Sequence, residues 1–104
     1  MSEQGLQVEL DDTGGDGPIA HLSGELDITS AIALHDQLAP LVENSGVRVD
    51  LSDIEFVDSS GLGALVQLHN LAAQRGTRFE LESIPERVQR LLEITKLTDL
   101  FTIV

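Results

Sequence analysis

The chain has 104 residues, of which 41% are apolar, and it contains three Phe but no Trp, Tyr or Cys. This length corresponds to a single domain with an aliphatic core, and the lack of cysteine excludes a disulfide framework, thiol catalysis and thiolate metal sites. The formal net charge of −12, from 18 acidic and 6 basic residues, argues against nucleic acids and anionic membranes as partners, because phosphate groups are bound by a positive field.

The first ten residues, MSEQGLQVEL, lack the basic start and apolar core of a signal peptide. No apolar run approaches the roughly 20 residues that a membrane-spanning helix needs. We therefore expect a soluble, cytoplasmic protein, and most of the acidic side chains are expected to serve solubility.

The first half of the chain predicts two strands and a helix. Residues 6–10 and 18–22 are expected to form a hairpin of strands around a turn at 11–18, where Gly, Asp and Pro cluster. A polar connection at 23–30 follows, in which Thr29 or Ser30 caps a helix over 31–44. The inward face of that helix carries apolar residues at helical spacing, namely Ile32, Leu34, Leu38, Leu41 and Val42. Pro40 is expected to bend or shorten this helix.

The second half predicts alternating strands and helices. Residues 47–51 form a strand, 52–58 a short extended crossover, and the next helix runs from the DSSG sequence to about residue 74, where Gly76 stops it. A strand at 77–83 is followed by a helix that Ser83 caps and Pro85 opens, with Val88, Leu91, Leu92 and, at the margin, Ile94 facing inward. Residues 100–104 form a last strand or extended tail.

This order, β-β-α-β-α-β-α-β, predicts the fold class. Alternating strands and helices pair in parallel through right-handed crossovers. We expect a single α/β domain over residues 1–104, with a central, mixed but mostly parallel sheet of about 4–5 strands and helices packed on it.

Enzyme motifs are not found in the sequence. There is no phosphate-binding G-x-x-x-x-G-K-[ST] loop, and Gly61 and Gly63 lack the third glycine of a dinucleotide site. No G-x-S-x-G surrounds Ser60, and the only later histidine is His69, which leaves a serine hydrolase without a base. The three histidines have no metal-ligand spacing. The prediction is therefore no catalytic residue, no cofactor and no metal.

The sequence DSSGLG at 58–63 has two interpretations. Asp and Ser are preferred helix caps, worth typically about 1 kcal/mol, and a capping serine needs no further role. Two glycines in one helical turn, however, each cost roughly 1 kcal/mol relative to Ala, and such inconsistencies mark close backbone approach or a functional site. A helix N-terminus also favours a phosphate. Leu62 fits either a core position or an exposed anchor.

Three segments of the chain resemble one protein family. GELDITS at 24–30, VDLSDIEFVDSSGLGAL at 49–65 and ERVQRLLEITKLTDLF at 86–101 are similar to the STAS-domain anti-sigma factor antagonists of bacteria. With the order of elements, the resemblance covers nearly the whole chain. One departure is Lys96, where the family commonly has Gly.

The resemblance implies a mechanism and a set of site residues. The unphosphorylated antagonist would sequester an anti-sigma factor that is also an ATP-dependent serine kinase, so that a sigma factor is released. Phosphorylation of Ser59 would end this binding, and a phosphatase would restore it. Asp58 would orient the site, and Asp27 would lie beside Ser59 and contact the partner or its nucleotide pocket. The remaining interface residues would be Ser60, Gly61 and Leu62.

The same family leaves an alternative open. Some of its domains serve as scaffold subunits or small-ligand sensors that are not controlled by serine phosphorylation. In that case Ser59 would be a helix cap, and a nucleotide or a lipid would stabilise the fold by mass action.

Overall fold

A five-stranded sheet lies at the centre of the structure, a computed structural model that describes residues 5–12, 15 and 17–104. Its strands are β1 (Leu6–Asp11), β2 (Ile19–Leu26), β3 (Val47–Val57), β4 (Phe79–Glu82) and β5 (Thr102–Ile103). They lie side by side in chain order, with β1 antiparallel to β2 and every later pair parallel. The predicted element order and mixed, mostly parallel sheet are confirmed.

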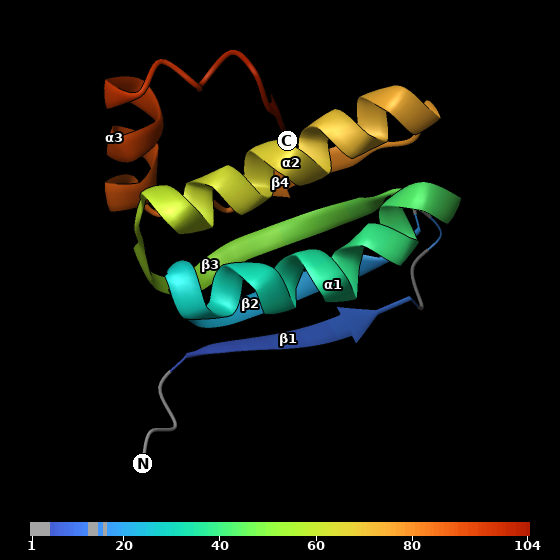
Figure 1. Cartoon of the computed structure of the whole chain (residues 1–104), viewed down its shortest axis with the longest axis horizontal. Helices are drawn as coiled ribbons and strands as arrows, with labels where there is room; N and C mark the ends of the chain where they lie inside the picture. The colour runs from blue at the N-terminus through green and yellow to red at the C-terminus, as the bar shows by residue number, and fades with distance from the viewer. Residues whose placement is uncertain (1–4, 13–14, 16) are drawn as a thin grey trace.

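Three helices connect the parallel strands: α1 (Ile28–Asn44), α2 (Ser59–Arg75) and α3 (Glu86–Ile94). Successive right-handed crossovers between neighbouring strands carry their helices to the same face of the sheet. Figure 1 shows α1 and α2 side by side across that face, with α3 at the end of the molecule where α2 begins. None of the described helices is long and apolar enough to cross a membrane.

The core lies between the sheet and these helices, and apart from Phe79 and Phe101 it is aliphatic, as predicted. Burial of such side chains contributes about 1.5–3 kcal/mol each relative to their exposure. The largest fully buried side chains are Leu22, Leu26, Leu34, Leu38, Leu51, Leu65, Leu68, Leu81, Leu92, Val42, Val47 and Val49.

The predicted polar connection at 23–30 is wrong for its first half. Strand β2 continues to Leu26, which is fully buried, because residues 23 and 24 pair with β1 on one side and with β3 on the other. Helix α1 consequently begins at Ile28, and its N-cap is Asp27 rather than Thr29 or Ser30. The predicted turn at 11–18 includes residues 13, 14 and 16, which lie outside the described residues.

The predicted crossover at 52–58 is also wrong, because β3 is one strand of 11 residues. Its first half pairs with both β2 and β4, whereas its second half pairs with β2 alone. Polar residues are tolerated in that second half since it is covered on fewer sides. Their presence in the sequence suggested a connection, whereas β3 continues through them with two register shifts against β2.

Two apolar residues predicted to face inward are exposed. The side chain of Ile32 is 70% exposed and that of Ile94 is 76% exposed. The buried face of α1 is formed by Leu34, Leu38 and Val42, and α1 continues past the exposed Pro40 to Asn44. Helical spacing identified these buried residues, but it did not show how narrow the covered face is.

The ends of α3 also differ in detail from expectation. Its N-cap is Pro85, and no side chain caps it, so Ser83 does not take the predicted role. At its other end, Lys96 adopts a left-handed φ of +61° and its N–H donates to the carbonyl of Glu93 at 3.1 Å. Lys96 therefore ends the helix in the conformation for which Gly is the usual residue.

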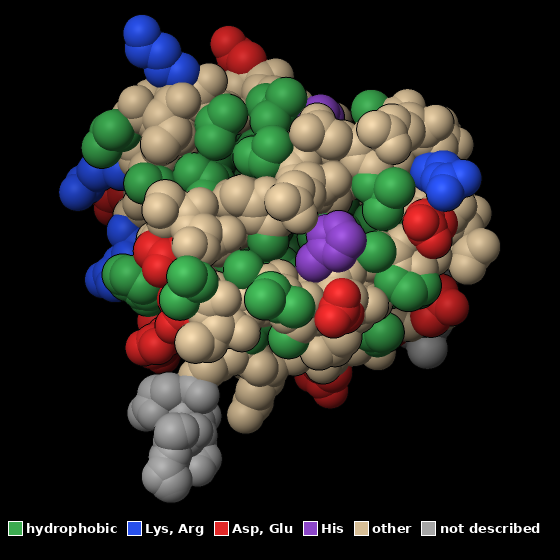
Figure 2. All heavy atoms as spheres, in the orientation of Figure 1, with side chains coloured by type: hydrophobic (Ala, Val, Ile, Leu, Met, Phe, Trp, Pro, Cys, Tyr) green, Lys and Arg blue, Asp and Glu red, His purple; other side chains and the backbone are tan. Residues whose placement is uncertain are grey.

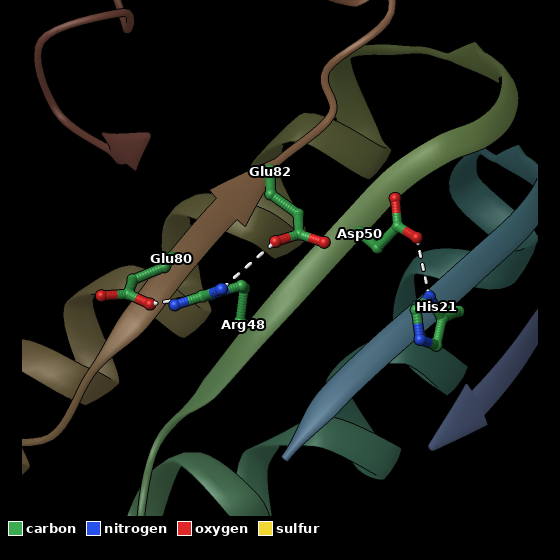
Figure 3. A network of polar contacts seen from close by, with 5 residues as sticks. All are labelled: His21, Arg48, Asp50, Glu80 and Glu82. Atoms are coloured by element: carbon green, nitrogen blue, oxygen red, sulfur yellow. Dashed lines mark hydrogen bonds and ion pairs between the residues drawn. The ribbon is translucent and has the colours of Figure 1, made fainter. Parts of the chain in front are cut away.

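A polar network lies on the sheet and joins three of its strands (Figure 3). Arg48 on β3 donates from Nε to Glu80 at 3.2 Å and from Nη1 to Glu82 at 3.4 Å, both on β4. His21 Nδ1 on β2 lies 2.7 Å from Asp50 Oδ2 on β3. These contacts tie neighbouring strands together through side chains.

Stability is expected to depend on pH through the His21–Asp50 pair. The hydrogen bond to Asp50 raises the pKa of His21 above its ordinary 6.5, so the stabilisation is complete below pH 6.5 and is lost as pH rises through the folded-state pKa. Burial alone would raise the pKa of Asp50, but hydrogen bonds from Ser52 and His21 lower it below 3.8. The stability that ionised Asp50 contributes is therefore lost as the pH falls through its folded-state pKa. Because His21 is partly exposed, the loss above pH 6.5 should be only about 0.2–1 kcal/mol.

Urea unfolding at pH 5.5 and at pH 8 measures this difference. The variants Asp50→Asn and His21→Gln should each show a smaller change between the two pH values than the wild type does. An unchanged difference in both variants would assign the pH dependence to other groups.

Candidate functional site

Two helix N-termini meet at the carboxyl edge of β2 and β3. Leu26, the last residue of β2, pairs with Val57, the last residue of β3. Asp27 and Asp58 each follow directly and form the N-caps of α1 and α2. The parallel register therefore brings two segments of the predicted site, from distant parts of the sequence, to one edge of the sheet.

Asp58, and not Ser59, makes the side-chain hydrogen bond that caps α2. Its Oδ1 accepts the N–H of Gly61 at 2.9 Å, its carbonyl accepts the N–H of Leu62 at 2.9 Å, and its own N–H donates to the carbonyl of Leu26 at 3.2 Å. Ser59 is the first residue of α2 and is exposed, and Ser60 beside it is half-buried. The interpretation of Ser59 as a capping serine is therefore wrong, because the aspartate before it makes the capping bond.

Asp27 is held by a dense set of hydrogen bonds at the start of α1. Its Oδ1 accepts the N–H and the hydroxyl of Thr29 at 3.0 and 2.8 Å and the N–H of Ser30 at 3.2 Å. The Ser30 hydroxyl accepts the N–H of Asp27 at 2.9 Å and donates to the carbonyl of Glu25 at 2.8 Å. The Thr29 hydroxyl, and then the Ser30 N–H, lower the pKa of Asp27, so the carboxylate remains charged at neutral pH.

Replacing Asp27 should separate its structural role from its charge. Asp27→Ala removes the cap and is expected to lower the free energy of unfolding by about 1 kcal/mol, whereas Asp27→Asn retains a comparable cap and should cost much less. Urea unfolding of the two variants at pH 7 measures this. Equal losses would show that the charge, and not the capping geometry, stabilises α1.

The two glycines in the first turn of α2 differ in whether the structure requires a residue without a side chain. A Cβ on Gly61 would lie 2.2 Å from the Leu26 carbonyl oxygen and 2.7 Å from the Leu26 side chain, so α2 approaches β2 as closely as only glycine allows. A Cβ on Gly63 would meet nothing within 4 Å. Leu62 is 4% exposed and packs in the core, which decides the alternative that the sequence left open.

A groove between α1 and α2 opens beside this site. It has a volume of about 460 Å³, and Ser60 and Gly63 line it together with Ile28, Ile32, His35 and Asp36. The sequence analysis did not identify it. One feature of the sequence could have indicated this groove. Ile28 and Ile32 lie one helical turn apart and are not on the helix face that Leu34 and Leu38 share, so they form a second apolar face of α1.

The histidines lie apart from one another. His21 bonds Asp50 on the sheet, His35 lines the groove between α1 and α2, and the ring of His69 meets that of Phe101 edge-on at 5.8 Å. Within residues 5–12, 15 and 17–104, no group of three His, Asp or Glu side chains could hold a metal ion.

Comparison with known proteins gives consistent relatives. The family model described as "Mlab, STAS domain" matches residues 10–103. The anti-sigma-B factor antagonist of Bacillus subtilis is 37% identical over 84 residues, which are 80% of this chain and 77% of that protein. The anti-sigma-B factor antagonist of Listeria monocytogenes is 29% identical, over 94% of this chain and 88% of that protein.

Solved structures share the fold. An anti-sigma factor antagonist from Mycobacterium paratuberculosis superposes with a TM-score of 0.81 at 24% identity, over 94% of this chain and 84% of that one. The Bacillus anti-sigma factor antagonist SpoIIAA matches in its unphosphorylated form with a TM-score of 0.76 at 16% identity, over 94% and 88% of the two chains. Its phosphorylated form matches with a TM-score of 0.72 at 15% identity, over 94% and 91%. The chain belongs to the STAS domain family of anti-sigma factor antagonists.

Proposed function

We propose that this protein binds and sequesters an anti-sigma factor that is also a serine kinase, and that phosphorylation of Ser59 switches this binding off. The sigma factor is released while Ser59 is unmodified, and a phosphatase restores that state. The protein itself acts by binding and performs no catalysis. The observation that carries the proposal is an exposed Ser59 at the first position of α2, with the capping task taken by Asp58.

The physical chemistry of a helix N-terminus supports a switch at this residue. A phosphoserine adds about −1.5 to −2 charges and three acceptor oxygens, which the positive end of the α2 dipole favours. The fold would therefore tolerate the phosphate, whereas an apolar or acidic surface packed on Ser59 would be repelled. SpoIIAA, which has the same fold, is known in both unphosphorylated and phosphorylated forms.

The proposed interface contains residues that a partner can contact and buried residues that hold them in position. Asp58 and Ser60 adjoin Ser59 in the chain, and Asp27 follows the neighbouring strand at the same edge of the sheet. In this proposal the three residues supply the polar contacts to the partner. Gly61 and Leu62 remain part of the proposed site, but they are buried. They act by fixing α2 against β2, so that the serines are presented in one position.

Phosphopeptide mapping of the protein isolated from its own cells, resting and stressed, tests the proposal. We expect a single phosphate on Ser59 whose occupancy changes with the condition. A Ser59→Ala strain provides the matched control, because the modified peptide must disappear from it. No phosphate under any condition would contradict the proposal.

The groove between α1 and α2 favours a second candidate function, that of a small-ligand sensor. Its volume of about 460 Å³ and its two exposed isoleucines would suit an apolar ligand. This function predicts that a nucleotide or a fatty acid raises the melting temperature of the unmodified chain and that Gly63→Leu, which would fill the groove, abolishes the increase.

A further inference from the structure

A second groove lies on the opposite side of the α2 entrance, between the end of β3 and α3. We call it the α3 groove. It has a volume of about 270 Å³ and is lined by Phe56, Val57, Arg87, Val88, Arg90, Leu91 and Ile94. Phe56 and Val57 directly precede Asp58, so this groove and the phosphorylation site share the same end of β3. The groove is separate from the one between α1 and α2, with which it has no lining residue in common.

The floor and rim of the α3 groove are apolar and accessible. Phe56 is 46% exposed and Ile94 is 76% exposed, although both are large apolar side chains. Val57 and Leu91 are half-buried beside them. Large apolar residues gathered in one depression are typical of surfaces that bind a partner.

The charge of this groove is opposite to that of the protein as a whole. The chain has a net charge of −12 and only six basic residues, and three of these, Arg87, Arg90 and Lys96, lie within ten positions on and after α3. Two of them line the groove, and no carboxylate does. Figure 2 shows basic side chains at the end of the molecule where α3 lies, with acidic side chains between them.

The two guanidinium groups are available to a partner in different degrees. Arg87 Nη1 donates to the carbonyl of Glu55 at 2.7 Å, which fixes α3 against the end of β3 and leaves the other donors of Arg87 to be used. Arg90 Nη2 lies 3.2 Å from Glu86, in an exposed pair of residues four positions apart. Because both side chains are largely exposed, such a pair contributes little to stability, so a carboxylate of a partner can replace Glu86.

We propose that the α3 groove is a second docking site of this protein and that it binds an acidic amphipathic helix of a partner protein. Apolar side chains of that helix, spaced by three and four residues, would fill the floor formed by Phe56, Leu91 and Ile94. Its carboxylates would bond Arg87 and Arg90, for which the planar guanidinium is well suited. The rest of the protein surface is acidic and would repel an acidic helix, which directs that helix to the α3 groove.

Binding of defined peptides to the full unmodified chain tests this proposal. The probe is a fluorescent 18-residue peptide with Leu at positions spaced by three and four and with Glu and Ala elsewhere, and its matched control carries Gln in place of each Glu. We expect saturable binding of the Glu peptide, weakened at least tenfold by R87E/R90E and by Ile94→Ser, and weakened further by salt. Arg75→Glu, on an exposed arginine at the far end of α2, should leave the affinity unchanged.

Several results would overturn the proposal. These are equal binding of the Glu and Gln peptides, an affinity that R87E/R90E does not change, and saturable binding of dodecanoate with none of the Glu peptide. Because Ile94 is largely exposed, the single variant Ile94→Ser keeps the test valid even if the double charge reversal unfolds the protein. Ser59 plays no part in these measurements, so their result is independent of the phosphorylation proposed above.

Discussion

Replacing Gly61 with alanine is expected to destabilise the fold by about 1–3 kcal/mol, because the added methyl group overpacks the contact between α2 and β2. The new Cβ would lie 2.2 Å from the Leu26 carbonyl oxygen, which is backbone and cannot rotate away. That same carbonyl accepts the N–H of Asp58 at 3.2 Å. A shift of α2 to relieve the overlap would therefore disturb the segment that presents Ser59.

Gly63→Ala is the matched control for this prediction. It places the same methyl group two residues further along the same helix, where nothing lies within 4 Å. Since alanine is favoured over glycine in a helix by about 1 kcal/mol, Gly63→Ala should raise the free energy of unfolding. Urea unfolding followed by circular dichroism measures both variants. Equal effects would mean that helix propensity, and not the close approach of α2 to β2, governs both positions.

Ser59→Asp is expected to weaken binding of the proposed partner, an anti-sigma factor kinase, at least a hundredfold while leaving the melting temperature within about 2 °C of the wild type. A hundredfold loss corresponds to about 2.7 kcal/mol of binding free energy. The physical reason is that a carboxylate at the first position of α2 interacts favourably with the helix dipole, so it does not disturb the fold, but it places a charge in the proposed interface. Isothermal titration calorimetry and thermal unfolding give the two quantities.

Two control variants test whether an effect of Ser59→Asp comes from the charge at position 59. Ser59→Ala should bind the kinase as the wild type does, because in the proposed switch the unmodified form is the one that binds. Gln74→Glu adds the same charge at an exposed position near the other end of α2 and should also bind normally. Retained tight binding by Ser59→Asp, with unchanged thermal stability, would falsify the proposed switch.

Much of the fold could be predicted from the sequence because its signals are local. Alternation marked β1 and the first half of β3, and the spacing of Leu34, Leu38 and Val42 identified the buried face of α1. Gly76, with its left-handed φ of +71°, stopped α2 where expected. Such signals depend on the conformation of a few consecutive residues, so they require no knowledge of the distant chain.

The errors arose where a distant segment determines the local structure. Polar residues at 23, 25, 52, 53 and 55 suggested connections, but pairing between β2 and β3 continues both strands to the site. Ile32 and Ile94 fitted the helical spacing, yet neither the sheet nor a neighbouring helix covers them. How much of an amphipathic face is buried depends on what packs against it.

The sequence by itself determined the α/β order of elements and the position of Ser59 at the start of a helix, because turn, cap and periodicity signals act over a few residues. Only the tertiary structure decided that Asp58 makes the capping bond while Ser59 is exposed, and that Gly61 serves the close approach of α2 to Leu26. It also decided that Asp27 and Asp58 directly follow the ends of two adjacent strands. The register between β2 and β3 pairs residues some 30 positions apart, and the pattern of neighbouring residues does not indicate which distant residues will pair.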